Sequence, residues 1–404
     1  MTVPEQVVTK PIAAKQVATK QTVTEQSAMK WGAALHIPDA VTIDGQEWSV
    51  RRAWPAGDSR IAWEASLPGQ GIRVGYLDEH GVRVLDADRD PKLPGLARLL
   101  ADGGRLVSHR PGKRAVVRLP DGSFAKCVRS GRAAAILAGQ RRAQAFAVGF
   151  ALPEVLAADD STAVLSRLSG VELHDPARLG EDWKRAWSEC LEAWARAGSS
   201  GRSGEAGHAG AATGGGSTGV EVPAHSAASE VQVLTEWQER AANLLGPSRH
   251  RVDVLVSDVS AELIDQAPET AEGSEPDWGP IHRDLHDKQL MWDPVLGPGL
   301  LDVDTACRGE RELDLGNLAA HARWRCAQGL WTESEAEVVL DAICTAASAS
   351  GSDTARIRTY ERAALLRLAC VYAFRPRWSD RTGILLDAVE SNRSEAVRRR
   401  ASTG

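Results

Sequence analysis

The segment 282–304 constrains the fold more than any other part of the chain. It begins with the polar run His-Arg-Asp-Leu-His-Asp-Lys-Gln and ends with Leu-Asp-Val-Asp. Between these runs, the apolar residues 290–292 and 300–301 flank an Asp-Pro and a Gly-Pro-Gly turn signal, a pattern that predicts two short strands joined as a hairpin. Such a hairpin returns Asp302 to the level of Gln289, so polar residues that are separated in sequence converge in space.

Three oxygen-bearing side chains in this segment have the spacing that phosphoryl transfer requires. That reaction needs a carboxylate near an acceptor hydroxyl and a Mg²⁺ ion held against the triphosphate by hard oxygen ligands. Asp284 lies in a short polar loop, where it is placed to accept the hydroxyl proton. Gln289 offers an amide oxygen to a metal ion, and Asp302 supplies an anionic ligand.

In these residues the chain resembles the aminoglycoside and choline phosphotransferase family, whose members carry a His-x-Asp-x-x-x-x-Asn loop followed by an Asp-centred metal motif. The resemblance implies a two-lobed, protein-kinase-like fold, with ATP and Mg²⁺ as cofactors and a small-molecule hydroxyl as acceptor. It implies that Asp284 is the catalytic base, that Gln289 replaces asparagine in the metal-binding amide position, and that Asp302 is the main Mg²⁺ ligand. Asp314 matches the family's downstream aspartate, whose implied role is to hydrogen-bond the loop.

The same residues allow other interpretations when each is taken alone. A His-x-Asp-x-His pattern is compatible with a zinc-binding strand, because alternate residues face one side and both imidazole and carboxylate bind zinc. A lone Asp-x-Asp is usually a solvated turn. The succession of loop, hairpin, Asp302 and Asp314 within about thirty residues favours the kinase-like site. His282 and His286 are then interpreted as residues that order the loop rather than as metal ligands.

Residues 101–170 are predicted to form the nucleotide-binding lobe. Two alternating runs flank a Pro-Gly turn in residues 105–119, which predicts a hairpin, and Lys126 lies on the short strand that follows. By the family resemblance, Lys126 contacts the α- and β-phosphates of the nucleotide. The last strand of this lobe resembles the family's hinge, where backbone groups near Ser166 and Leu168 bind the adenine edge.

The helix predicted over residues 132–147 lacks a residue that the resemblance leads us to expect. Related kinases place a glutamate on this helix to pair with the lysine, whereas residues 132–147 contain no acidic side chain. Gln140 and Gln144 are the hydrogen-bond acceptors that the helix offers instead. Either a glutamine orients Lys126, or the assignment of this lysine is wrong.

The predicted fold class is α+β, with an antiparallel sheet and a helix in the N-lobe and a mainly helical C-lobe. Residues 1–30 are polar and aperiodic, which predicts a disordered tail. Residues 31–100 are predicted to form an accessory β-rich module packed on the first lobe. Residues 171–404 are predicted to form the helical C-lobe with the catalytic site. Within it, residues 198–228 are rich in Gly, Ser and Ala, which predicts a disordered insertion.

Composition excludes several other functional classes. The formal net charge of -6 argues against nucleic acid as a partner, because the phosphate backbone attracts basic surfaces. The chain has no long apolar run, which argues against both export and membrane insertion. Its six cysteines form no Cys-x-x-Cys pair, which predicts reduced thiols in a cytoplasmic protein without a zinc site.

The acceptor site is expected between Asp284 and the C-terminal helices. Asp287 and Asp304 are candidates to line it and to attract an aminoglycoside, an amino sugar or a related metabolite, although pairing with arginine explains such residues equally well. Two other functions stay open. A maltokinase-like sugar kinase is favoured by Gln289, and a nucleotide-binding pseudokinase that acts as an interaction module is favoured by the missing glutamate. The sequence indicates no oligomeric state.

Overall fold

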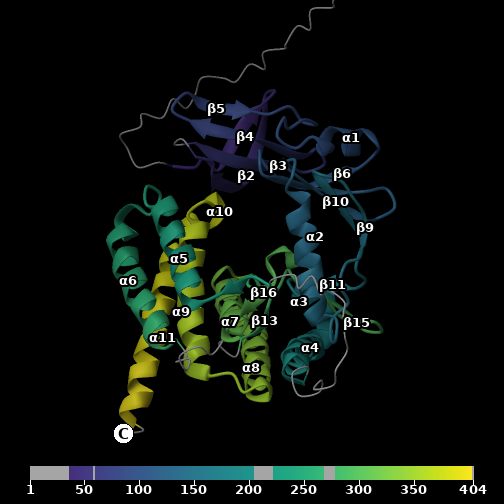
Figure 1. The fold of residues 1–404 in the computed structure, drawn as a ribbon. Coiled ribbons are helices and arrows are strands. Elements are labelled where there is room, and N and C mark those ends of the chain that lie inside the picture. Colours follow the sequence, from purple (N-terminus) through teal and green to yellow (C-terminus); the bar gives the residue numbers. More distant parts are fainter. Residues whose placement is uncertain (1–35, 58–59, 204–221, 268–277, 403–404) are drawn as a thin grey trace, which may run out of the picture.

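The computed structural model describes residues 36–57, 60–203, 222–267 and 278–402 (Figure 1). The predicted tail over residues 1–30 therefore lies outside the described residues. Two five-stranded sheets lie at one end of the molecule and most of the helices lie at the other, with two three-stranded sheets among them. Among the described residues, no helix combines the length and the apolar character that crossing a bilayer requires.

The first sheet is an antiparallel meander in which each strand pairs with the next along the chain. Two-residue turns with positive φ, such as Asp44-Gly45, suit the twist of these hairpins. Its apolar face joins the largest hydrophobic core of the molecule. The strands are β1 (Ala40–Ile43), β2 (Gln46–Pro55), β3 (Ile61–Leu67), β4 (Gly71–Asp78) and β5 (Gly81–Val84).

The second sheet has the strand order β6-β7-β8-β10-β9 and carries Lys126 on β8. Helix α1 covers one face of this sheet through a small apolar core, and helix α2 leads from the sheet toward the helical lobe (Figure 1). The elements are α1 (Gly95–Ala101), β6 (Arg105–Arg110), β7 (Arg114–Arg118), β8 (Phe124–Val128), α2 (Ala133–Arg142), β9 (Val155–Ala158) and β10 (Thr162–Leu165).

The helical lobe is built on long amphipathic helices whose apolar faces meet in two cores. On α4 the tryptophans recur at helical spacing and are all buried, and Trp183 and Trp187 pack edge to face with each other and with Trp331, so they are core residues, as the spacing predicts. The helices are α3 (Pro176–Leu179), α4 (Trp183–Ser203), α5 (Ala227–Ala241), α6 (Arg249–Asp265), α7 (Glu312–Ala327), α8 (Glu333–Ser350), α9 (Thr354–Tyr372), α10 (Pro376–Ser379) and α11 (Thr382–Ser402).

The two small sheets bring distant segments of this lobe together. One consists of β11 (Val171–Glu172), β14 (Leu290–Asp293) and β15 (Gly297–Leu300). The other consists of β12 (Ala224–His225), β16 (Cys307–Gly309) and β13 (Gly279–Ile281). Regular structure thus reaches into both ends of the predicted insertion 198–228, because α4 continues to Ser203 and β12 begins at Ala224; residues 204–221 lie outside the described residues.

The N-terminal sheet contacts both lobes, which extends the predicted packing on the first lobe alone. Toward the second sheet, the buried carboxylate of Glu64 accepts a hydrogen bond from the amide of His109 at 2.7 Å. Toward the helical lobe, the amide of Ala53 donates to the carbonyl of Phe374 at 2.9 Å, and Arg375 Nη1 donates to the carbonyl of Ala53 at 2.6 Å. The guanidinium of Arg375 also packs over the ring of Trp54 at 5.4 Å. The sheet therefore ties the two lobes together.

We expect Arg375→Ala to lower the free energy of unfolding by about 2 kcal/mol, because it removes hydrogen bonds from a charged donor and a cation–π contact. Urea denaturation followed by tryptophan fluorescence measures the change. Arg377→Ala is the matched control, since this arginine is exposed on the same short helix. Its expected effect is within about 0.5 kcal/mol. Equal effects of the two substitutions would contradict the role assigned to Arg375.

Candidate active site

Asp314, on α7, holds the backbone of the loop that carries Asp284. Its fully buried carboxylate accepts hydrogen bonds from the amides of His282 and Arg283, each at 2.8 Å, and from the indole of Trp194 at 3.2 Å. Three N–H donors satisfy a carboxylate that has no contact with water. This geometry matches the loop-ordering role that the resemblance implies for Asp314.

A second anchor, which sequence reasoning missed, is Asn317. Its Nδ2 donates to the carbonyl of Arg283 at 3.0 Å, and its Oδ1 accepts from Arg367 at 2.7 Å. Arg283 has φ 74°, a left-handed conformation that a β-carbon disfavours, so anchors on both of its peptide groups are needed to maintain it. The signal in the sequence was the i, i+3 spacing from Asp314, which places Asn317 on the same face of α7.

The bend at Arg283 leaves the side chain of Asp284 half exposed. Its Oδ1 lies 3.5 Å from Nη1 of Arg367, on α9. A carboxylate in this position is open to a molecule from solvent, and a guanidinium lies beside it. Asp284 therefore has the accessibility that a general base needs.

The β14–β15 hairpin places Asp302 beside Gln289. Leu290 pairs with Leu300, and the amide of Leu301 donates to the carbonyl of Gln289 at 2.8 Å. The ring of the buried His282 contacts the carbonyl of Leu301 at 2.8 Å through Nε2, which joins the loop to this hairpin. The register is the one that the turn signals predict, and His282 has the position expected of a loop-ordering residue.

Lys126 joins the two lobes at this point. Its Nζ lies 2.7 Å from Oδ1 of Asp302 and 2.8 Å from both carboxylate oxygens of Asp304. Burial alone would raise the pKa of Asp302, but the Lys126 ammonium and the Arg114 guanidinium outweigh it and hold that pKa well below its usual range. Burial alone would likewise lower the pKa of Lys126, and the two carboxylates raise it instead. Asp302 and Lys126 are therefore both charged at neutral pH.

Asp304 occupies the role left open by the missing helix glutamate. The 3-10 turn Val303–Thr305 packs directly on α2, where a β-carbon at Gly139 would lie 2.6 Å from the Cα of Asp304. Arg142, one turn further along α2, donates to the carbonyl of Asp304 at 3.1 Å. Glycine is required at position 139 for this close approach.

Neither Gln140 nor Gln144 orients Lys126, which corrects one of the two explanations drawn from the sequence. Within the described part of the chain, the buried amide side chain of Gln140, on α2, has no hydrogen-bond partner, and the side chain of Gln144, in the 3-10 turn Ala143–Phe146 that follows α2, contacts the carbonyl of Gln140. Asp304 was expected at the acceptor site, but its carboxylate faces Lys126. The Asp-x-Asp pattern was the available signal, although nothing in it reveals that α2 lies alongside.

Asp287 does not line an acceptor site, contrary to the expectation. It is fully buried, and Arg325 on α7 donates to both of its oxygens at 3.0 Å, while the ring of His174 contacts one of them. Burial alone would raise the pKa of Asp287, but Arg325 and His174 hold it well below its usual range. The zinc-strand interpretation of His282, Asp284 and His286 is disfavoured for another reason, since these residues follow strand β13 in a bend and do not form a strand.

His286 and Gln289 lie beside this buried ion pair. The ring of His286 stacks on that of His321 with centroids 4.6 Å apart, and its Nε2 lies 3.2 Å from the side-chain nitrogen of Gln289. His286 thus contacts the amide whose oxygen is the predicted metal ligand. This is a positioning contact for Gln289, in keeping with the loop-ordering role predicted for His286.

The two residues predicted at the hinge, Ser166 and Leu168, contact other parts of the protein. The amide of Ser166 donates to the carbonyl of Glu154, and its hydroxyl accepts from the amide of Glu154, each at 2.8 Å. The amide of Ser166 is therefore not available to an adenine ring. Leu168 packs toward β15, where a β-carbon at Gly299 would lie 3.0 Å from its Cδ1. The adenine contacts predicted at these two residues stay a prediction.

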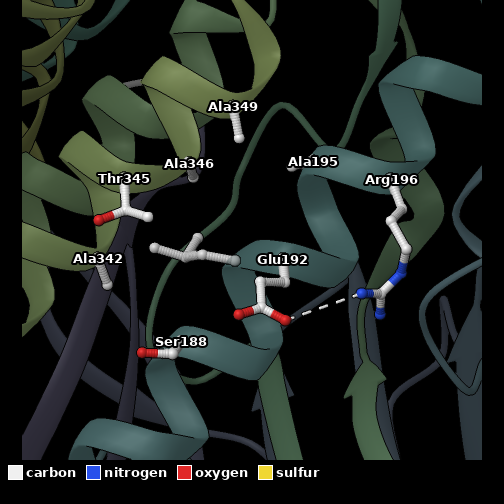
Figure 2. A pocket seen from close by; sticks show the side chains of 9 residues that line it. Ser188, Glu192, Ala195, Arg196, Ala342, Thr345, Ala346 and Ala349 are labelled. Carbon is white, nitrogen blue, oxygen red and sulfur yellow. Dashed lines mark ion pairs between the residues drawn. The ribbon is translucent and has the colours of Figure 1, made fainter.

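A cavity of about 320 Å³ lies away from the residues described above, between α4 and α8 (Figure 2). Four of the nine residues that line it are alanine, and Glu192 and Arg196 form an ion pair at 4.0 Å on one side of it. It carries neither convergent donors nor an excess of charge. The candidate active site is therefore the cluster between the lobes and not this cavity.

Residues 106–360 match the model of the phosphotransferase enzyme family, a span that includes Lys126, Asp284, Asp302 and Asp314. The chain belongs to the phosphotransferase enzyme family. This membership confirms the resemblance found in the sequence. The comparison with curated proteins found no match.

Solved structures of kinases are similar to this chain. A choline kinase from Cryptosporidium parvum has a TM-score of 0.51 at 8% identity, over 73% of this chain and 90% of that chain. An aminoglycoside phosphotransferase from Streptomyces rimosus has a TM-score of 0.47 at 21% identity, over 69% of this chain and 97% of that chain. A glucosamine kinase in complex with glucosamine, ADP and inorganic phosphate has a TM-score of 0.45 at 13% identity, over 88% and 96%. The predicted two-lobed, protein-kinase-like α+β fold with an additional N-terminal sheet is confirmed.

We expect Lys126→Met to destabilise the protein in a pH-dependent way. In the wild type, the depressed pKa of Asp302 stabilises the fold above the ordinary value of 3.8 and loses this effect as the pH falls below it. Without the ammonium, burial raises that pKa, so ionisation of Asp302 costs free energy as the pH rises. The loss should be about 1–3 kcal/mol at pH 7 and smaller near pH 4.

Thermal unfolding at several pH values without divalent cations measures this difference. Lys184→Met is the control, because Lys184 is exposed on α4 and forms no ion pair within the described part of the chain. A Lys126→Met effect that is independent of pH would show that the ammonium does not govern the charge of Asp302.

Proposed function

We propose that this chain is an ATP- and Mg²⁺-dependent phosphotransferase that phosphorylates a hydroxyl group of a small molecule. The observation that carries the proposal is the contact of Lys126 with Asp302 and Asp304. It joins a cation from the N-lobe sheet to carboxylates from the C-lobe, in a member of the phosphotransferase enzyme family. A pseudokinase that acts only as an interaction module needs no such convergence, so the enzyme is the better interpretation.

The donor set between the lobes fits Mg²⁺. Asp302 and Asp304 offer carboxylate oxygens and Gln289 offers an amide oxygen, which are the hard ligands that Mg²⁺ prefers. The two carboxylates already converge on one positive charge, the ammonium of Lys126. When bound, the metal ion neutralises charge on the phosphates. We assign Asp302 and Gln289 as its ligands, and Asp304 as a further candidate.

Lys126 and Asp284 then have separate tasks. Lys126 binds phosphate oxygens of ATP with the charge that Asp302 and Asp304 balance in the structure. Asp284 orients the acceptor hydroxyl and accepts its proton, because its half-exposed carboxylate stands on a backbone held by Asp314 and Asn317. The rigid loop positions the base before the acceptor binds, and this lowers the entropic cost of orienting the two reacting groups.

For the acceptor we propose an aminoglycoside, an amino sugar or a related amine-bearing metabolite. The exposed carboxylate of Asp284 favours a cationic acceptor by charge. Gln289 keeps a maltokinase-like sugar kinase as the second candidate, on the resemblance drawn from the sequence.

Turnover of ATP with a panel of acceptors tests the proposal. The panel contains aminoglycosides, glucosamine, choline, glucose and maltose, each with and without Mg²⁺, and ADP release is measured beside the phosphorylated product. We expect Mg²⁺-dependent product with at least one amine-bearing acceptor. Product with maltose alone would favour the second candidate, and the absence of nucleotide binding under all conditions would contradict both.

Two substitutions separate the metal ligand from the base. Asp302→Asn should weaken Mg·ATP binding by about tenfold or more, since a ligand of the metal is lost. Asp284→Asn should leave Mg·ATP affinity nearly unchanged while kcat falls by about 10²- to 10⁴-fold. Calorimetric titration of Mg·ATP beside steady-state turnover measures both effects.

The matched control is Asp341→Asn, because Asp341 is exposed on α8 and distant in sequence from these loops. Its turnover should stay within about twofold of the wild type. An Asp284→Asn enzyme with near-normal kcat would exclude Asp284 as the base, whatever the effect at Asp302.

A further inference from the structure

A cavity of about 240 Å³ lies between the N-terminal sheet and the turn that joins β6 to β7. Its walls come from β2 to β5, from the segment between β5 and α1, and from that turn. None of the described residues that line it belongs to the proposed catalytic or metal-binding set. The described lining is Pro55, Ala56, Arg60, Ala62, Tyr76, Arg83, Leu85, Asp90, Pro91, Lys92, Arg110, Pro111, Lys113 and Arg129.

The lining is strongly cationic. Six of these side chains are arginine or lysine, and a single aspartate, Asp90, is the anion among them. Asp90 already has hydrogen-bond partners within the protein, because it contacts His109 Nε2 at 3.0 Å and accepts from the amides of Gly112 and Lys92 at 2.6 and 2.9 Å. Among the described residues, no carboxylate lies within ion-pair distance of Arg83, Lys92, Arg110, Lys113 or Arg129.

Apart from Asp90, the polar side chains that line the cavity are hydrogen-bond donors. The ring of Tyr76 lies under the guanidinium of Arg83 at 5.1 Å, and its hydroxyl points toward the turn, where a β-carbon at Gly112 would lie 2.9 Å from it. Burial raises the pKa of Tyr76, with Asp90 adding to the effect, so this hydroxyl stays protonated at neutral pH. Guanidinium, ammonium and phenol groups in one small space match the acceptor oxygens of a phosphate.

The turn at the edge of the cavity is connected to the proposed active site. Arg129 Nε donates to the carbonyl of Gly112 at 2.6 Å, so a ligand on Arg129 acts on the tip of the β6–β7 hairpin. Strand β7 begins directly after this turn with Arg114, whose charge helps to lower the pKa of Asp302. The amide of Gly112 donates to Asp90 at 2.6 Å, so this amide is not available to a nucleotide phosphate.

We propose that this cavity binds the phosphate group of a small phosphorylated metabolite, at a site separate from that of the nucleotide, and that the bound anion holds the β6–β7 turn in place. The inference goes beyond the proposed function and does not depend on it. A volume of about 240 Å³ suits a phosphate and a few attached atoms and not a whole nucleotide. The unpaired cations gain a partner that the protein itself does not supply.

Binding of inorganic phosphate, pyrophosphate and glucose 6-phosphate to the full chain tests this proposal by calorimetry in the presence of EDTA. The titrations are repeated with a saturating non-hydrolysable Mg·ATP analogue, without EDTA. Hydrogen exchange of the peptide that covers residues 105–118 is measured beside them. We expect binding in both conditions and slower exchange in the turn when the anion is bound.

The test variant is Arg83→Gln with Lys92→Gln, because both side chains are exposed at the cavity and neither belongs to the proposed machinery. The control is Arg105→Gln with Arg118→Gln, an exposed cross-strand pair at the other end of the same hairpin that removes the same net charge. We expect anion affinity to fall about tenfold or more in the test variant and to change less than about twofold in the control. The single variants serve if the double variant does not fold.

The outcomes separate the alternatives. Tighter binding of glucose 6-phosphate than of inorganic phosphate supports a phosphorylated metabolite, and the reverse order overturns that part of the proposal. An equal loss in the two double variants, an absence of binding at about 10 mM, or displacement by the nucleotide analogue overturns the site. If the analogue itself does not bind, the proposed function fails. The titrations in EDTA still show whether the cavity binds an anion.

Discussion

The contact of Lys126 with Asp302 and Asp304 is the constraint on which the arrangement of the lobes depends. A lysine ammonium and two carboxylates are costly to remove from water singly, and each is stabilised here by the others. The contact spans 176 positions of the chain, so it sets how the N-lobe sheet faces the C-lobe. Gly139 and Arg142 hold α2 against the same turn, which makes the lobe interface and the proposed active site one structure.

A second set of buried charges supports the loop from behind. Asp314 and Asp287 are both fully buried, but Asp314 is satisfied by N–H donors and Asp287 by a guanidinium. Both contacts join the loop to α7, because Asp314 lies on α7 and accepts from the loop amides, while Asp287 lies in the loop and accepts from Arg325 of α7. Two residues of the site have left-handed backbone conformations. Arg283 precedes the proposed base, and Asp302 is the proposed metal ligand. Strain of this kind is maintained only where the surroundings over-determine it.

Local chemistry allowed much of the fold to be predicted from the sequence. Turn residues and alternation predicted the hairpin around Gly112 and the register that brings Asp302 to Gln289, because both depend on neighbours in the chain. Roles that depend on distant partners were not predictable. Asp287 was expected at the acceptor because the sequence does not reveal that Arg325 lies against it. The pairing of Asp304 with Lys126 required knowledge of where α2 packs.

The link between Ala53 and Arg375 joins residues that are 322 positions apart. The N-terminal sheet precedes the helical lobe in the chain, but its apolar side chains belong to the same hydrophobic core as residues near the C-terminal end, such as Phe374 and Val389. Until those residues leave the ribosome, this core is incomplete, and non-local contacts of this kind form slowly. Folding of the whole chain thus waits for its C-terminal end, and a chain that stops short of α9 leaves an open apolar sheet exposed to aggregation.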